Sequence, residues 1–536
     1  MNGYQAMAKI LKAEGVDILF AFPHQTLIEV GAQEGILPII CRQERAGVNM
    51  ADGYSRIHNG RKIGVFSMQR GPGAENAFGG VAQAYADSIP LLALPGGEPF
   101  DRLGVQPTFE AVPNYKGITK WSSMLYKPAT ISAVMRRAFT QLKHGRLGPV
   151  LVEMTNDVIT ADYPADAVDY QPVVRRTSAA SAEDVRDLVT ALLKASNPVI
   201  NAGHGLMFAE ATPELVEFAE LTHIPVMTTL AGKSAFPENH RLALGTGASS
   251  GTLMVHRFLQ STDFVLGVGT SFTRSVFTAP MPDNVPLAQV TNCAEDINKD
   301  YVVSYGAVGD AKVVLRQMIE EVKRQVGENG RGDVHGVVDR IAAIRQEFMA
   351  EWEPHFTSNE MPISPYRVFR ELENAVDVAN TIITHDSGYP REQLVPFWKP
   401  TTPRGYLGWG KSTQLGYGLG LALGAKLAAP DKTVINVMGD AVLAWPVSTR
   451  DGGPLRHRHA DRGAQQRRDD PLRPPHALCV RPLWRQRHGA YAVWPRLGAH
   501  AQQVTRPDEL APAIRAALAV TANNRPALIE VKTKAE

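Results

Sequence analysis

This chain has few cysteines, little excess of charge of either sign and no long apolar run. Each of these features excludes a class of protein. Its 536 residues hold three cysteines, Cys41, Cys293 and Cys479, too few and too widely spaced for a disulfide framework or a zinc site. A reducing, cytoplasmic setting is therefore expected. No apolar run reaches the roughly 18 residues that a membrane-spanning helix needs, and the N-terminus lacks a secretory pattern. The net charge of +2 provides no general attraction to nucleic acid or anionic membranes.

The length predicts about three domains of ordinary globular composition. A polar stretch at 165–185 and a glycine- and charge-rich cluster at 327–333 separate them. Strand and helix patterns alternate on both sides of these stretches, so the expected fold class is α/β, with three doubly wound parallel-sheet domains. The expected domains span 1–165, 182–325 and 358–536.

The first domain places a carboxyl group where a strand gives way to a helix. Pro23 ends an apolar strand at 17–22, and Glu44 follows a second strand at 37–41, so Glu44 can be both buried and directed into a cleft. A turn at 71–76 (GPGAEN), which ends at Asn76, begins another helix. Each feature also has an ordinary interpretation, since a helix N-terminus favours an acidic residue and glycine suits any tight connection.

The last domain combines glycines, a strand with a polar end and an aspartate. The strand at 381–388 ends in Ser387 and Gly388, and the glycine-rich run 405–418 contains Leu415. A buried strand then ends in the turn Gly439, Asp440, Ala441. A carboxylate just past a parallel strand, among small neighbours, suits a metal ion that clamps a diphosphate.

In this order and spacing the motifs resemble thiamine-diphosphate-dependent enzymes, and above all the acetolactate synthases and related 2-oxoacid carboligases and decarboxylases. The resemblance covers residues 1–444 and 489–536. It implies pyrimidine-binding, central and diphosphate-binding domains, with thiamine diphosphate and Mg²⁺ as cofactors and Asp440 as a metal ligand. The residues that it places at the cofactor are Pro23, Glu44, Asn76, Ser387, Gly388, Leu415, Gly439, Asp440 and Ala441.

The resemblance also implies roles and partners. A glutamate matching Glu44 hydrogen-bonds the aminopyrimidine ring, whose imino nitrogen then removes the thiazolium proton. Leu415 would fill the angle between the two cofactor rings, or is simply a core leucine. The implied reaction is decarboxylation of a small 2-oxoacid with carboligation to a carbonyl acceptor; decarboxylase or carbon–carbon lyase chemistry is the alternative. A homodimer or homotetramer with sites between subunits is implied, without nucleic acid or membrane. His24 stands where the synthases usually carry glycine, so the resemblance does not specify the identity of the carbonyl acceptor.

The sequence of the central domain is compatible with a second cofactor but does not require one. In the synthases this domain holds FAD, and the glycine turns near 203–205 and 267–269 are compatible with a nucleotide. The segment 270–275 (TSFTRS) lacks the Arg-Phe-Asp-Asp-Arg pattern of the FAD-containing members, which disfavours FAD without excluding it.

Residues 445–488 break the pattern of the last domain. The family requires Asn-Asn about 26 or 27 residues after the aspartate, at the end of an apolar strand that supplies another metal ligand. Here residues 457–467 read HRHADRGAQQR, and 450–488 hold ten arginines, four histidines, five prolines and no lysine. Such a segment cannot form a buried central strand, because it would bury charges. Either a basic insert has replaced core elements, or the reading frame is disrupted.

A shift of one base favours the second interpretation. With permitted codons, residues 451–466 become TAVRYGIAMLTVVLNN, an apolar strand ending in Asn-Asn, and 480–489 become FDRYGGNDMG, an ordinary loop for this family. A basic insert that binds nucleic acid would also interleave aromatic residues, which this one lacks. We therefore expect an enzymatic lineage in which this chain binds cofactor poorly, unless Gln466 or Asp469 replaces the missing ligand.

Overall fold

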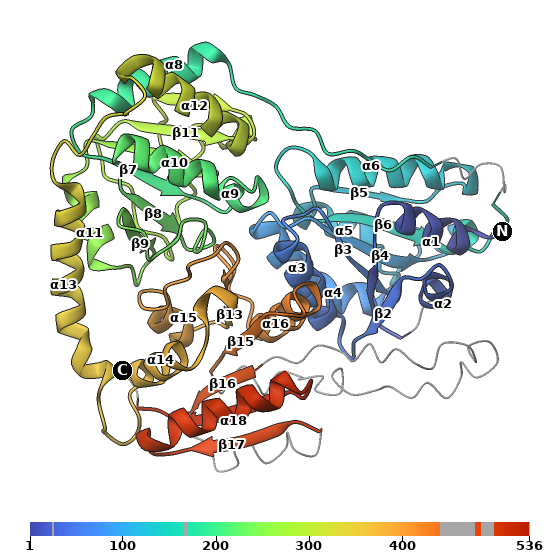
Figure 1. Ribbon diagram of the computed structural model, residues 1–536. Helices are drawn as coiled ribbons and strands as arrows, with labels where there is room; N and C mark the ends of the chain where they lie inside the picture. The colour runs from blue at the N-terminus through green and yellow to red at the C-terminus, as the bar shows by residue number, and fades with distance from the viewer. Residues whose placement is uncertain (24–25, 164–169, 440–477, 484–497, 535–536) are drawn as a thin grey trace.

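The computed structural model describes residues 1–23, 26–163, 170–439, 478–483 and 498–534. These residues form three six-stranded sheets in which every strand pairing is parallel, with helices packed on the sheets (Figure 1). The predicted α/β class with three doubly wound sheets is confirmed. Within the described part of the chain, no helix is long and apolar enough to cross a membrane.

The N-terminal sheet has the strand order β2-β1-β3-β4-β6-β5. Its strands β1, β3 and β6 are buried along their whole length, as expected of apolar runs covered by helices on both faces. The elements are α1 (Gly3–Ala13), β1 (Ile18–Ala21), α2 (Thr26–Gln33), β2 (Leu37–Ile40), α3 (Glu44–Ile57), β3 (Gly64–Met68), α4 (Pro72–Ala86), β4 (Leu91–Gly97), α5 (Ala111–Tyr115), β5 (Trp121–Met124), α6 (Ile131–Lys143), β6 (Val150–Thr155) and α7 (Asn156–Ile159).

The central sheet has the order β12-β11-β10-β7-β8-β9, which reverses direction between β7 and β10. In open sheets of this kind, ligands bind beyond the carboxyl ends of the strands at such a switch point. The elements are α8 (Ala182–Lys194), β7 (Pro198–Ala202), α9 (Gly205–Phe208), α10 (Thr212–Thr222), β8 (Val226–Thr229), β9 (Ala243–Gly247), α11 (Leu253–Ser261), β10 (Phe264–Val268), β11 (Leu287–Thr291), β12 (Tyr305–Val308) and α12 (Ala311–Val326).

The long helix α13 (Val337–Phe356) runs from the central part to the C-terminal sheet, whose order is β14-β13-β15-β16-β18-β17 (Figure 1). This order repeats that of the N-terminal sheet, strand for strand. The elements are α14 (Pro365–Ala375), β13 (Thr381–His385), α15 (Tyr389–Leu394), β14 (Tyr406–Leu407), α16 (Tyr417–Ala428), β15 (Thr433–Val437), β16 (Leu478–Leu483), β17 (His500–Val504), α18 (Leu510–Ala522) and β18 (Ala527–Lys532).

Strand β16 was not predicted. It pairs with β15 on one side and β18 on the other, so it takes the sheet position expected for the strand that ends in Asn-Asn. The sequence interpretation treated residues 480–489 as an out-of-frame loop, and a described strand over 478–483 corrects that part of it. Residues 457–467, which were judged unable to form a central strand, lie outside the described residues.

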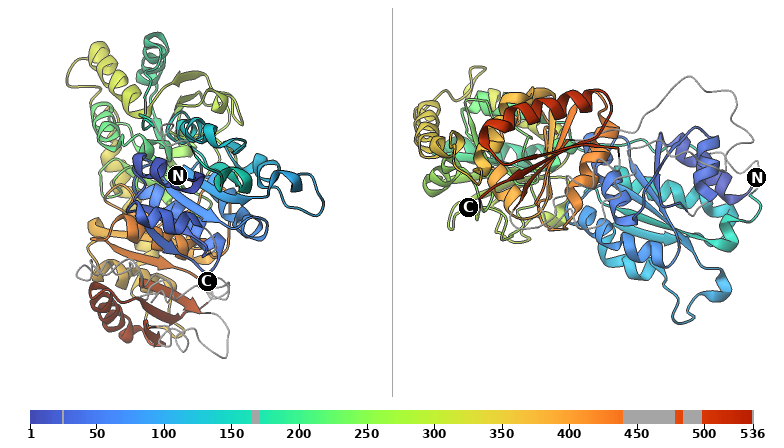
Figure 2. Two further views of the ribbon diagram at one scale, coloured as in Figure 1. Left: turned by 90° about the vertical axis from the view of Figure 1, so that its right-hand side faces the viewer. Right: turned by 90° about the horizontal axis from the view of Figure 1, so that it is seen from below.

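The N-terminal and C-terminal sheets lie side by side, joined by helices α3 and α16 (Figures 1 and 2). Glycines permit this close approach. A β-carbon on Gly424 would lie 1.9 Å from the carbonyl oxygen of Met50, and one on Gly53 would lie 2.3 Å from that of Leu421. Both helices follow the second strand of their own sheet, so they occupy equivalent positions in the two halves.

Candidate active site and central pocket

The candidate cofactor residues of the N-terminal domain lie at the carboxyl edge of their sheet. Pro23 follows β1 and is exposed, and Glu44 is the first residue of α3, where it is 4% exposed. Asn76 lies near the start of α4, and its Nδ2 donates to Glu44 Oε2 over 3.3 Å. The structure thus brings together Glu44 and Asn76.

Small and aromatic neighbours complete the surroundings of Glu44. A β-carbon on Gly73 would lie 2.8 Å from the β-carbon of Gln69, so glycine is required in this turn, which begins α4 beside the carboxylate. Tyr115 is fully buried and its hydroxyl donates to the carbonyl oxygen of Ala74. Burial and, secondarily, the Glu44 charge raise the pKa of Tyr115, so it stays a neutral hydrogen-bond donor. Glu44 is therefore shielded from water and held in place.

In the C-terminal domain, candidate residues follow two adjacent strands. Ser387 and Gly388 come after β13, Gly388 with a positive φ of 86°, and Gly439 comes after β15. Asp440 and Ala441 lie outside the described residues. Among the described residues, no group of three His, Cys, Asp or Glu side chains could hold a metal ion.

Asp386 is the residue of this edge that sequence reasoning missed. Its carboxylate accepts backbone N–H groups from Ser387 at 2.7 Å, Gly416 at 3.1 Å and Gly418 at 2.8 Å. Burial raises the pKa of Asp386, and these three hydrogen bonds oppose that rise. The carboxylate thus ties the end of β13 to the start of α16. A polar residue ending an apolar strand was visible in the sequence, but its backbone partners 30 residues away were not.

Leu415 lies just before this anchored turn and is 43% exposed, although it is a large apolar residue. The neighbouring Gln414 has both polar atoms of its side-chain amide shielded from solvent and without a hydrogen-bond partner among the described residues. Since shielded polar atoms are nearly always paired, this pair of neighbours fits a site that receives a ligand with both apolar and polar parts.

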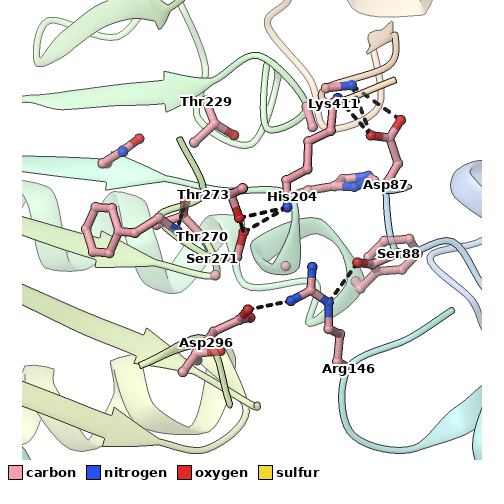
Figure 3. A pocket seen from close by; sticks show the side chains of 18 of the residues that line it. Asp87, Ser88, Arg146, His204, Thr229, Thr270, Ser271, Thr273, Asp296 and Lys411 are labelled. Atoms are coloured by element: carbon pink, nitrogen blue, oxygen red, sulfur yellow. Dashed lines mark hydrogen bonds and ion pairs between the residues drawn. The ribbon is translucent and has the colours of Figure 1, made fainter. Parts of the chain in front are cut away.

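A large pocket lies at the switch point of the central sheet. It holds about 1290 Å³ of empty space, counting its open mouth, and all three parts of the chain line it (Figure 3). His204 and Gly205 follow β7, and residues 269–273 follow β10, so the pocket lies where the strand order reverses.

Charges from the other two sheets complete this pocket. Arg146 of the N-terminal part donates to Ser88 Oγ at 2.9 Å and to Asp296 at 2.5 Å. Lys411 of the C-terminal part reaches in from the opposite side, beside Asp87 (Figure 3). The buried Oδ1 of Asn201 lines the pocket without a hydrogen-bond partner among the described residues. The pocket therefore has the size, position and polar groups for a nucleotide-like ligand.

Family models match the chain in three places. The N-terminal TPP binding domain of thiamine pyrophosphate enzymes matches residues 1–118, the central domain 185–318 and the C-terminal TPP binding domain 386–445. The chain belongs to the thiamine pyrophosphate (thiamine diphosphate) enzymes. The resemblance found in the sequence is thereby confirmed, and the chain is an enzyme of the acetolactate synthase-like group.

Curated relatives of this thiamine pyrophosphate enzyme point to the same group. A probable acetolactate synthase large subunit of Methanocaldococcus jannaschii is 32% identical over 463 residues, which are 82% of this chain and 76% of that protein. The one from Methanococcus aeolicus is 30% identical with the same coverage. The acetolactate synthase isozyme 3 large subunit of Escherichia coli is 28% identical over 456 residues, covering 82% of this chain and 78% of that protein.

Proposed function

We propose that this chain belongs to an enzymatic lineage that decarboxylates a small 2-oxoacid and ligates the product to a carbonyl acceptor. The reaction depends on thiamine diphosphate and Mg²⁺. The observation that carries the proposal is the buried Glu44 at the start of α3, in a chain whose relatives are named as acetolactate synthases. When bound, thiamine diphosphate supplies the reactive carbon and the electron sink for decarboxylation. The protein then needs few acids or bases of its own.

In this proposal Glu44 is the catalytic residue. Its carboxyl group would hydrogen-bond the cofactor's pyrimidine and hold a proton there. Asn76 orients this carboxyl group through its hydrogen bond, and the buried Tyr115 helps to exclude water from it. Leu415 supports the angle between the cofactor rings. Ser387, Gly388 and Gly439, which follow β13 and β15, would border the diphosphate, and Asp440 would bind Mg²⁺.

We further infer that the active site forms between two copies of the chain, in a homodimer or homotetramer. The exposed surfaces of Leu415, Asn76 and Pro23 support this, since a half-built site must leave its contact residues open until the partner covers them. Phe78, also on α4, is a large apolar side chain that is 38% exposed.

The disrupted segment sets a limit on activity. The match to the C-terminal TPP binding domain ends at residue 445, where the arginine-rich sequence begins. This supports a reading-frame disruption and a catalytically impaired member of the family, because the second metal-ligand motif falls within the altered stretch.

Two measurements test the proposed function. Calorimetric titration of thiamine diphosphate at millimolar Mg²⁺ should show binding well weaker than micromolar in the chain as written, and near-micromolar affinity would contradict the impairment. Product analysis with pyruvate, in a chain with the frame restored, should give acetolactate. Acetaldehyde in its place would favour the decarboxylase alternative.

A further inference from the structure

Lys411 is a cation of the C-terminal domain that reaches into the central pocket. Its Nζ donates to Ser271 Oγ at 3.0 Å and to Thr273 Oγ1 at 3.1 Å (Figure 3). It forms no ion pair with any described carboxylate. Burial, followed by the charges of Arg146 and Lys299, lowers the pKa of Lys411 to about 8. Two neutral hydroxyl groups therefore hold a charge that a buried site would normally pair.

The carboxylates nearest to Lys411 are already engaged. Asp87 Oδ2 accepts from Arg56 Nη2 at 2.9 Å, and Asp296 Oδ1 accepts from both Arg146 and Lys299. No described carboxylate is therefore left to pair with Lys411, and the partner that we infer is an anion of a ligand. Phosphate or carboxylate groups of a ligand would satisfy this requirement, because they accept charge-assisted hydrogen bonds from an ammonium group.

The backbone around Lys411 belongs to the segment that precedes the cofactor helix. The N–H groups of Gly410 and Lys411 donate to Asp87 Oδ1 at 3.0 Å and 3.3 Å. At the other end of this segment, 410–418, the N–H groups of Gly416 and Gly418 donate to Asp386. One short stretch is thus tied to the N-terminal domain, the C-terminal domain and, through the Lys411 side chain, the central domain.

Leu415 lies between these two ends of the segment and is 43% exposed in the described structure. If the Lys411 side chain moved toward a ligand in the central pocket, it would displace segment 410–418 in that direction. Asp87 and Asp386 bind the two ends of the segment. The position of Leu415 therefore depends on how firmly Lys411 is held.

We propose that Lys411 is a positioning residue: it binds the anionic group of a nucleotide-like ligand in the central pocket and thereby couples occupancy of that pocket to the order of segment 410–418. The inference rests on the proposed function for the identity of this segment as the cofactor-bordering one. The coupling between the central pocket and segment 410–418 does not require a catalytically active chain.

Hydrogen–deuterium exchange of the full-length protein tests the coupling, with FAD as the probe. Saturating FAD should slow backbone exchange across 410–418 several-fold in the native sequence. Lys411→Met should weaken FAD binding about tenfold, the loss expected for one charge-assisted hydrogen-bonding group. It should also abolish the protection of 410–418 even at saturation.

Lys299→Met is the matched control. It removes a cation of the central domain that pairs with Asp296, near the same pocket, and that has no described hydrogen bond to the segment. It should preserve the protection of 410–418. Equal protection in Lys411→Met and the native chain would overturn the proposal, as would a native chain that does not bind FAD at millimolar concentration. Failure of thiamine diphosphate binding or of carboligation would leave these exchange patterns unchanged, so the two proposals fail separately.

Discussion

The N-terminal and C-terminal sheets share one strand order but differ in how they connect their third and fourth strands. In the N-terminal sheet the chain passes from β3 to β4 through residues 69–90, which include the single helix α4. In the C-terminal sheet the passage from β15 to β16 takes residues 438–477, nearly twice as many. The family spacing would end the fourth strand near residue 466, well before β16 begins. The same scaffold is thus regular in one half and altered in the other.

The two halves also contribute different chemistry from equivalent positions. Helices α3 and α16 both follow the second strand of their sheet, but α3 begins with the acid Glu44, whereas α16 begins after glycines held by Asp386. One helix start therefore carries an acidic side chain, and the other carries backbone N–H groups bound by a carboxylate. The same strand order occurs twice in the chain, with different residues at equivalent positions.

Restoring the reading frame should have the largest effect. If residues 451–466 are replaced by TAVRYGIAMLTVVLNN, we expect thiamine diphosphate to bind about a hundredfold more tightly, since even supporting residues of metal sites contribute 10- to 100-fold. Calorimetry at millimolar Mg²⁺ measures this change. A control with Arg456→Lys and Arg458→Lys keeps the basic charge and should bind as weakly as the chain as written. Equal affinity for thiamine diphosphate in the restored and the unaltered chain would contradict the interpretation that the reading frame is disrupted.

Glu44→Gln should have the next largest effect, in the restored chain. Exchange of the cofactor's C2 proton with deuterated solvent should slow by about 10²- to 10⁴-fold, the usual contribution of a positioned acid or base. The affinity for the cofactor should change only a few-fold. Glu75→Gln, on an exposed acid of α4, is the matched control and should exchange at the native rate. Native exchange in Glu44→Gln would remove Glu44 from the mechanism.

The two halves also differ in how much the sequence could predict. Local patterns predicted most strands and the position of Glu44, because apolar runs and helix starts are visible in neighbouring residues. They missed β5, β6, β9, β12, β14, β16 and β17. The glycine turns near 203–205 and 267–269 indicated a nucleotide site in the central domain. The contacts of Asp386 and Lys411 join residues far apart in the chain, such as Lys411 with Ser271, so no local pattern could have predicted them.

Gly424→Val should break the contact between the two equivalent helices. The added β-carbon would fall 1.9 Å from the carbonyl oxygen of Met50, so α3 and α16 must separate. We expect a loss of about 3 kcal/mol in the free energy of unfolding, at the upper end for overpacking. Urea unfolding followed by tryptophan fluorescence measures it. Gly117→Val, which has open space around its β-carbon, should change stability by no more than about 0.5 kcal/mol. A similar loss of stability in both variants would show that the contact between α3 and α16 does not account for the effect of Gly424→Val.

Asp386→Asn should have the smallest effect, and it tests the difference between the two helix starts directly. The asparagine keeps one acceptor oxygen but turns an amino group toward backbone N–H donors. Loss of about one hydrogen bond, roughly 1 kcal/mol, should speed exchange at Gly416 and Gly418 about fivefold at neutral pH. Asp377→Asn, on an exposed cap that accepts from Ala379, should leave both sites unchanged.

The pH dependence gives a second readout of Asp386. Because burial raises its pKa, the folded state keeps this proton to a higher pH than the unfolded chain does. The contribution of Asp386 to the free energy of unfolding is therefore greatest below the unfolded pKa and declines as pH rises to the folded pKa. Asp386→Asn should lack this decline, because the amide does not titrate, and Asp377→Asn should retain it. If Asp386→Asn and the native chain lost stability in parallel over that range, the anchoring carboxylate would not be a buried, titrating group, and the distinction between the starts of α3 and α16 would rest on glycine alone.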